Sequence, residues 1–259
     1  MARSTHSFGA PGLLREWTAR TLRGRYQQSW LGWLWDVIQP VAQAMMLAVV
    51  FTYIVPIDTG DTPYLLFAFV ATVPWAFLSG ALTDMTNSLV ENMSLVNKIY
   101  FPRDVLPVAS MLARLADFAV AWVFVLVLAA VLGAPVASAA LLALPAILLV
   151  QLLLTVGLGL AGAAANVFVR DTRSVLVLVL QLWFYASPVL YPIERVPAGL
   201  RSAYVLNPMV GVIEGYRAVL LRGEWPDATL LVAAAVSAVV FLGGYAVFKA
   251  LEFRFADIV

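Results

Sequence analysis

Long apolar runs separated by short polar breaks make up most of this chain. Six of them reach or approach the length of a membrane span, at about 35–55, 64–82, 106–132, 139–169, 175–191 and 230–251. A helix needs about 20 mainly apolar residues to cross the hydrocarbon core of a bilayer. The breaks contain the proline, glycine and aspartate that are typical of turns. The pattern predicts an all-α polytopic membrane protein with six transmembrane helices and both chain ends on one side.

A polar stretch from Thr83 to Asp104 follows the second apolar run. We expect a loop with helical pieces there, because a bilayer core would not accept so many polar side chains. Leu89, Met93 and Val96 are spaced by four and three, which indicates one apolar helical face. Two interpretations stay open: the segment folds back on its own membrane domain, or it presents a short helix to a soluble partner.

The N-terminal segment 12–30 has the pattern of an amphipathic interface helix that lies along the membrane surface. Trp17 falls on its apolar arc and Arg20 and Arg23 on its polar arc, whereas Arg25 intrudes on the apolar side. Basic amphipathic helices of this kind bind the interface by burying the apolar face and pairing with anionic lipid. The segment is either such an anchor or an anchor with an additional docking or gating role.

The residues between the fifth and sixth runs remain apolar enough to touch lipid. Asn207 followed by Pro208 is a helix start, with Asn as the cap and Pro at the first helical position. The run Met209–Leu221 is only about 20 Å long as a helix, which is too short to cross. We therefore expect it to dip into the membrane and return. Glu214 and Arg217, three residues apart, form either a pair that lowers the cost of burying each charge or a surface pair of little weight.

The composition agrees with the span pattern and excludes several functions. Apolar residues make up 63% of the 259 residues and charged residues 12%, and the mean hydropathy is +0.91. A chain without cysteine and with a single histidine has no thiolate metal site, no cysteine nucleophile and no His-rich metal site. A net charge of +1 gives no case for nucleic-acid binding.

Basic residues indicate the orientation. With the N-terminus inside, twelve of the 16 Lys and Arg residues fall in the inner segments, and the positive-inside rule therefore predicts that both termini are cytoplasmic. Charged residues at the predicted span ends are expected to reach water rather than to form a proton relay. They are Asp36, Asp84, Arg114, Asp117, Arg170 and Asp171. No charge is predicted at the middle of a span, so the energy for any transport must come from elsewhere.

The remaining chemistry is aromatic. The chain has no Gly-x-x-x-x-Gly-Lys-Ser/Thr phosphate loop and no paired carboxylates for acid–base work inside the membrane. Aromatic side chains in the second and fifth spans either line a pathway and stack on sugar rings, or pack helices and mark the membrane interface. These candidates are Trp75, Trp183, Phe184, Tyr185 and Tyr191.

Five segments together resemble a known family. They are LRGRYQQSWLGWLWDVIQP (22–40), SLVNKIYFPRDVLP (94–107), VRDTRSVLVLVLQLWFYASPVLYP (169–192), LNPMVGVIEGYRAVLLRG (206–223) and FRFADIV (253–259). In this order they are similar to the type-2 ABC transporter permeases of bacterial polysaccharide export, the membrane subunits of O-antigen, capsule and teichoic-acid exporters. The likeness covers nearly the whole chain.

The resemblance implies a single transmembrane domain over residues 1–259 that works as a homodimer above two copies of a cytoplasmic ABC ATPase. It implies a coupling helix at about 87–98, re-entrant outer helices at about 195–225, and an interface helix that contacts the ATPase and borders the cytoplasmic opening. The implied coupling residues are Leu89, Asn92, Met93, Val96, Asn97 and Lys98. It also favours the aromatic residues as lining of a glycan channel.

The expected function is that of a transport permease, not an enzyme: export of a lipid-linked, O-antigen-like polysaccharide across the bacterial inner membrane. The chain itself is expected to hold no cofactor, because ATP and magnesium would bind to the partner subunit. Alternatives are a teichoic-acid or capsule permease, a type-2 ABC permease for a drug or another lipid, a membrane anchor for a soluble partner, and a polytopic lipid- or glycan-processing enzyme.

Overall fold

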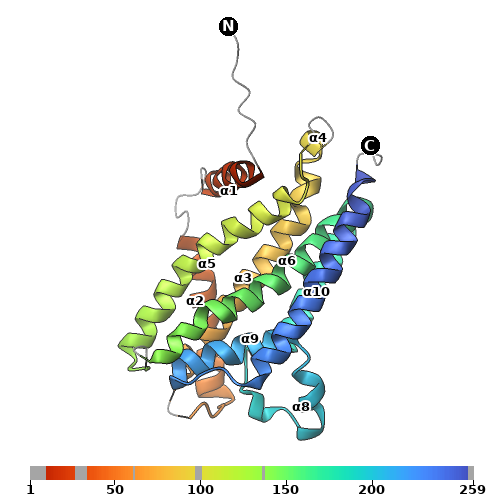
Figure 1. Cartoon of the computed structure of the whole chain (residues 1–259). Coiled ribbons are helices and arrows are strands. Elements are labelled where there is room, and N and C mark those ends of the chain that lie inside the picture. Colours follow the sequence, from red (N-terminus) through yellow and green to blue (C-terminus); the bar gives the residue numbers. More distant parts are fainter. Residues whose placement is uncertain (1–9, 27–33, 61, 97–100, 136–137, 256–259) are drawn as a thin grey trace.

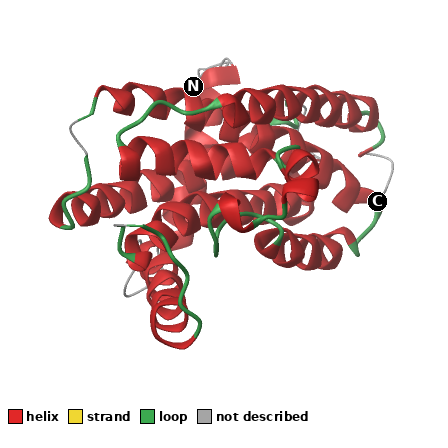
Figure 2. Ribbon diagram, turned by 90° about the horizontal axis from the view of Figure 1, so that it is seen from below, coloured by secondary structure: helices red, strands yellow, loops and turns green. Residues whose placement is uncertain are grey.

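Helices and their connecting loops make up the described part of the protein. The computed structural model describes residues 10–26, 34–60, 62–96, 101–135 and 138–255, and every regular element in these ranges is helical (Figure 2). The α-helices are α1 (Ala10–Tyr26), α2 (Leu34–Val49), α3 (Tyr64–Glu91), α4 (Met93–Val96), α5 (Val105–Val131), α6 (Leu144–Phe168), α7 (Thr172–Tyr185), α8 (Ala198–Tyr204), α9 (Pro208–Arg217) and α10 (Ala228–Glu252). Two π-helical turns, η1 (Val50–Ile54) and η4 (Ala218–Arg222), and two 3-10 turns, η2 (Ala139–Ala143) and η3 (Ile193–Arg195), complete the list.

Among the described residues, four helices are long and apolar enough to cross a membrane: α3, α5, α6 with its leading turn η2, and α10. The predicted all-α, multi-pass character is therefore confirmed. The apolar helices α2 with η1 and α7 are shorter. At 14 residues α7 is about 21 Å long, and it ends at Tyr185 rather than at the expected Tyr191. Six crossings thus remain a prediction.

Helix α3 is longer than the second predicted span, 64–82. Helix α3 continues through the polar residues after Leu82 and ends at Glu91, so about the first two-fifths of the stretch from Thr83 to Asp104 belong to this helix and not to a loop with helical pieces. Hydroxyl groups of this part donate to carbonyl oxygens of their own helix, Thr83 to Ser79 at 2.8 Å and Ser88 to Met85 at 2.7 Å. Polar side chains that bond back in this way are compatible with a helix. A prediction from polarity alone therefore ends this helix too early.

Glycines let helices α6, α9 and α10 approach closely. A Cβ atom on Gly157 of α6 would lie 2.6 Å from the Cα atom of Phe241 in α10. A Cβ atom on Gly244 would overlap the carbonyl oxygen of Gly157, and one on Gly211 of α9 would overlap that of Thr229. Small residues permit this backbone contact between membrane helices.

Buried amides connect helix α6 to its neighbours. The Gln151 side chain donates to the carbonyl oxygen of Pro74 at 2.8 Å and accepts from the Tyr216 hydroxyl at 3.1 Å. Asn166 donates to the carbonyl oxygen of Thr86 at 2.9 Å. Each bond satisfies a group that hydrocarbon would leave without a partner. Together they hold α3, α6 and α9 in one register.

The bundle has two distinct ends (Figure 1). Helix α1, helix α4 and the C-terminal end of α10 lie at one end, and α8 and the turn that follows η1 lie at the other. The predicted interface helix 12–30 is present as α1 but runs over Ala10–Tyr26. Its expected last residues, 27–30, lie outside the described part of the chain.

Candidate functional site

A cavity of about 450 Å³ opens between helices α2, α3, α5 and α7. Its wall combines aromatic rings, amide side chains, and one basic and one acidic side chain. The residues used below are Gln39, Gln43, Trp75, Arg114, Asp117, Gln181, Phe184 and Tyr185. Aromatic surface with a few convergent polar groups is the usual lining of a ligand site, and we name this site the amide cavity.

Three of the five predicted channel aromatics line this cavity, namely Trp75, Phe184 and Tyr185. The ring of Trp75 makes edge-to-face contacts with Trp183, at 5.7 Å between centroids, and with Phe184, at 5.6 Å. The side chain of Tyr185 is 57% exposed. Because Trp75 and Phe184 are buried against each other, Tyr185 is the ring with most surface free for a ligand.

The other two predicted aromatics hold the end of α7 instead. The Trp183 indole donates to the side-chain oxygen of Asn207 at 2.9 Å, and that oxygen also accepts from the backbone N–H of Met209 at 3.1 Å. Asn207 is therefore the predicted cap of α9, with Pro208 at the first helical position as expected. Trp183 and the cap together connect α7 to α9.

Tyr191 also connects the end of α7 to a neighbouring helix, in this case α8. Its hydroxyl donates to the carbonyl oxygen of Tyr185 at 3.0 Å and accepts from the Tyr204 hydroxyl at 3.2 Å. Burial, and then this hydrogen bond, raise the pKa of the Tyr204 phenol above its ordinary value. Tyr204 therefore stays neutral as a donor, and Tyr191 acts in this structure as a connecting residue rather than as cavity lining.

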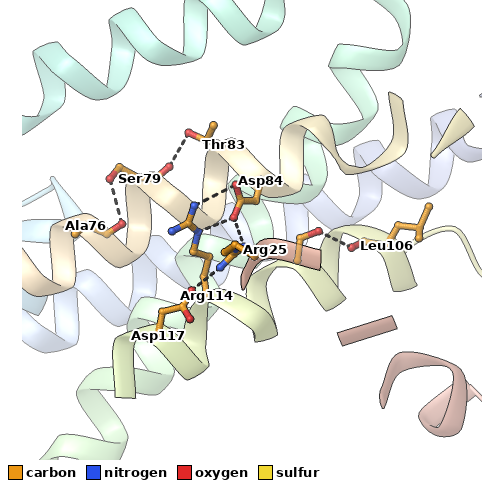
Figure 3. A network of polar contacts seen from close by, with 9 residues as sticks. Arg25, Ala76, Ser79, Thr83, Asp84, Leu106, Arg114 and Asp117 are labelled. Carbon is orange, nitrogen blue, oxygen red and sulfur yellow. Dashed lines mark hydrogen bonds and ion pairs between the residues drawn. The ribbon is translucent and has the colours of Figure 1, made fainter. Parts of the chain in front are cut away.

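Arg114 and Asp117 of the cavity lining belong to a network of ion pairs (Figure 3). Asp84 of α3 accepts from the Arg114 Nε atom of α5 at 2.6 Å and from the Arg25 Nη2 atom of α1 at 2.6 Å. The other terminal nitrogen of Arg25 pairs with Asp117 of α5. Two guanidinium groups and two carboxylates from three helices thus form one connected group, which we name the Arg25 network.

The Arg25 network changes two expectations. Asp84, Arg114 and Asp117 were expected to reach water at the span ends. In the structure Asp84 pairs with Arg114 and Arg25, and Asp117 pairs with Arg25, across helices. Asp117 lies about 18 Å along α5 and is only 8% exposed, so a charge does occur well inside a predicted span. A buried carboxylate needs such a partner. The pairing also explains why Arg25 interrupts the apolar arc of α1: it points into the bundle.

Of the remaining predicted residues of α1, Arg20 and Arg23 are exposed and Trp17 is partly buried. Trp17 packs against the core from its partly buried position, and Arg20 stacks over its ring at 4.6 Å. Trp17, Arg20 and Arg23 line a shallow open cavity. Helix α1 packs on α5 rather than standing apart from the bundle (Figure 1).

The predicted coupling segment is the end of α3 plus the short helix α4. Leu89 and Val96 are buried in the core and Met93 packs against it, while the Asn92 amide donates to the carbonyl oxygen of Ser88 at 2.9 Å. Asn97 and Lys98 lie outside the described residues. The side chains exposed at this end are Val90, Glu91 and Ser94.

At the opposite end, the predicted pair of Glu214 and Arg217 is present, with 2.9 Å between the carboxylate and the guanidinium. Arg217 is only 1% exposed, so the surface interpretation is wrong. Its other terminal nitrogen donates to the carbonyl oxygen of Val189 at 3.2 Å, and the guanidinium lies 3.5 Å from the ring centre of Phe67. These contacts offset the burial of its charge.

The amides of the cavity were not identified from the sequence. Gln39 and Gln43 on α2 are four residues apart, as are Gln181 and Tyr185 on α7, and each pair therefore shares a helix face. The signal that was present is an amide recurring at helical spacing within an apolar run. A span pattern by itself does not distinguish such amides from the other positions of an apolar run.

Comparison with known proteins gives consistent matches along the chain. The sequence matches the ABC-2 type transporter family over residues 13–221. It is 32% identical to the O-antigen export system permease protein RfbA of Myxococcus xanthus over 95% of each chain. The corresponding protein of Klebsiella pneumoniae is 25% identical over 93% of this chain and 92% of its own. The polysialic acid transport protein KpsM of Escherichia coli is 24% identical over 79% of each chain.

Proposed function

Because this chain belongs to the ABC-2 type transporter family, we propose that it is the membrane-spanning subunit of an ATP-driven exporter of polysaccharide. Two copies would form a channel through which a lipid-linked, O-antigen-like glycan crosses the bacterial inner membrane. The names of the O-antigen and polysialic acid permeases support this substrate class. ATP and magnesium would bind to a separate cytoplasmic subunit.

The observation that carries this proposal is the amide cavity inside an apolar bundle. A glycan chain is too polar to enter hydrocarbon, so its pathway must supply hydrogen-bonding groups within the membrane. Gln39, Gln43 and Gln181 supply such groups on the apolar helices α2 and α7, and Tyr185 adds an exposed ring. A sugar ring offers hydroxyl groups at its edge and C–H groups on its faces, which match amides and aromatic rings respectively.

We expect a second copy of the chain to close the open side of the cavity. Helix α7 buries only Leu180 and Phe184 against its own chain. Gln181 and Tyr185 are on its open side and line a cavity that is itself open. Two such faces placed together would enclose a polar lumen and keep the amides away from lipid.

Movement would reach the cavity through α3 and α1. Helix α3 runs without interruption from Glu91, at the proposed ATPase end, past Trp75 in the cavity wall. The Arg25 network connects α1 to the same helix and to α5. A displacement at the α4 end would therefore be transmitted as a rigid-body shift of helices that line the pathway.

Replacing Tyr185 with alanine tests the proposed pathway. We expect export of a lipid-linked glycan by the complex of this chain and its ATPase, reconstituted in liposomes, to fall about tenfold, which corresponds to about 1.4 kcal/mol. Thermal stability of the complex should hardly change, because the ring is 57% exposed. Liposomes with this chain alone should neither hydrolyse ATP nor move glycan; activity there would contradict the proposal, as would full export by the variant.

A single cysteine at Ser94 tests the orientation and the docking surface together, since the chain has no native cysteine. Ser94 is exposed in α4. We expect an impermeant thiol reagent to leave Ser94→Cys unlabelled in intact cells, to label it in inverted vesicles, and to be blocked there by the bound ATPase. The matched variant Ser202→Cys in α8 should label in intact cells. Labelling of the two sites in the reverse pattern would show that the orientation is inverted.

A further inference from the structure

The three glutamines of the amide cavity are exposed to its interior and carry no internal hydrogen bond. Gln39, Gln43 and Gln181 are all exposed and line the same cavity. Within the part of the chain that the structure describes, their side chains have no hydrogen-bond partner, whereas the buried Gln151 uses both its amide atoms. Unpaired amides on membrane helices do not face lipid. Their donors and acceptors are available to a ligand or to water.

Amide groups suit a particular class of ligand. An amide both donates and accepts, as a sugar hydroxyl does, and it carries no charge. The exposed ring of Tyr185 lies four residues from Gln181 on the same face of α7, so stacking and hydrogen bonding are offered to one sugar unit side by side. Nothing in this pair of interactions requires a charged group on the sugar.

The charges at the cavity wall neutralise one another. Arg114 and Asp117 are the charged residues of the lining. Arg114 pairs with Asp84, which also pairs with Arg25, and Arg25 pairs with Asp117. Among the described residues, the lining therefore has one positive and one negative group, and each of them has an ion-pair partner of opposite charge. A polyanion entering this cavity would lose its hydration without meeting an uncompensated cation, which is unfavourable in a low-dielectric surrounding.

These observations distinguish between substrates that the relatives leave open. One relative is named for polysialic acid, a polymer with a carboxylate on every unit, and others for O-antigens. From the amides and the neutralised wall we infer that this exporter selects a polysaccharide whose repeat unit has no net charge, and that it discriminates against polyanionic glycans such as polysialic or teichoic acid. This inference rests on the proposed export function. It adds the charge class of the substrate.

The test compares two polymers in one host. Cells that lack their own glycan exporters receive this chain with its ATPase and make either lipid-linked polymannan, which is neutral, or lipid-linked polysialic acid. For each polymer the measured quantity is the ratio of surface to intracellular polysaccharide. We expect this ratio to be at least about tenfold higher for polymannan than for polysialic acid, because each charged unit carries a desolvation penalty. Equal export, or better export of polysialic acid, would overturn the charge selection and leave the proposed export function intact. Export of neither polymer would reject the export function itself.

Variants locate the selection in the cavity. The triple variant Gln39→Lys, Gln43→Lys and Gln181→Lys should raise the ratio of exported polysialic acid to polymannan at least about fivefold, because it adds the cations that the wild-type wall lacks. The matched triple variant to Glu should lower that ratio. Retention of the ATPase on co-purification shows that each variant folds. An unchanged ratio in both variants, with folding intact, would contradict the assignment of selectivity to these amides.

Discussion

Replacing Gly244 with valine is expected to prevent assembly of the membrane bundle. A Cβ atom at this position would overlap the carbonyl oxygen of Gly157, and the obstacle is backbone that no rotamer change can move. Helices α6 and α10 would have to separate, which removes close packing over much of their length. We expect a loss of at least about 3 kcal/mol of stability, at the upper end of overpacking effects. The measurement is the yield of monodisperse protein in detergent and its thermal unfolding temperature.

The neighbouring glycine provides the control. A Cβ atom on Gly243 would meet nothing within 4 Å, so Gly243→Val changes the same residue type one position away without the clash. We expect yield and unfolding temperature close to those of the wild type. Similar losses in both variants would mean that valine is harmful to α10 in general, and would contradict the close contact of α6 with α10.

Reversing the charge of Arg25 is expected to abolish transport while most of the bundle remains folded. In Arg25→Glu three carboxylates would meet beside Arg114, where Arg25 now pairs with Asp84 and Asp117. Removing one partner of a buried pair costs about 3–5 kcal/mol. Arg25 is 20% exposed, which reduces this to about 1–3 kcal/mol through solvent screening. That free energy is enough to release α1 but not to unfold the four long helices.

The readouts separate release of α1 from unfolding. We expect glycan export to fall at least about tenfold, and trypsin to cleave faster after Arg15, Arg20 and Arg23 of α1. Arg25→Lys retains the positive charge but not the forked geometry that reaches two carboxylates, so it should lie between wild type and Arg25→Glu. If export by Arg25→Glu equals that of the wild type, α1 is not part of the transport path.

The span pattern was predictable because hydrocarbon imposes one rule on every crossing segment. The bounds of α5, of α6 together with its leading turn η2, and of α10 agree with the apolar runs to within two residues. Helix α3 departed from the prediction for a local reason: hydroxyl side chains such as Thr83 bond to carbonyl oxygens of their own helix, so about 2.5 polar turns after Leu82 remain helical. Helix α7 departed in the opposite direction, since the chain turns after Tyr185 to meet the Asn207 cap.

Parts of the site were predictable to different degrees. The Asn207 cap and the pairing of Glu214 with Arg217 depend on neighbours in sequence, and both were predicted. The coupling residues illustrate the limit. The spacing of Leu89, Met93 and Val96 predicted one apolar helical face, but the helix breaks at Asn92, so Leu89 lies in α3 and the other two residues in α4. Spacing alone also does not say whether these side chains meet a partner or the chain itself. In the structure they meet the core of the chain.

By itself the sequence determined that this chain is a membrane-embedded helical protein, where most of its helices lie and which family it resembles. Each of these properties follows from residue composition, short-range spacing or ordered motifs. Only the tertiary structure decided that Arg25 pairs with Asp84 and Asp117 and that Gln39, Gln43 and Gln181 share one cavity. Such contacts join residues as far as 142 positions apart, as for Gln39 and Gln181. Glycines and buried amides pack the whole bundle, and this packing decides which helix faces meet.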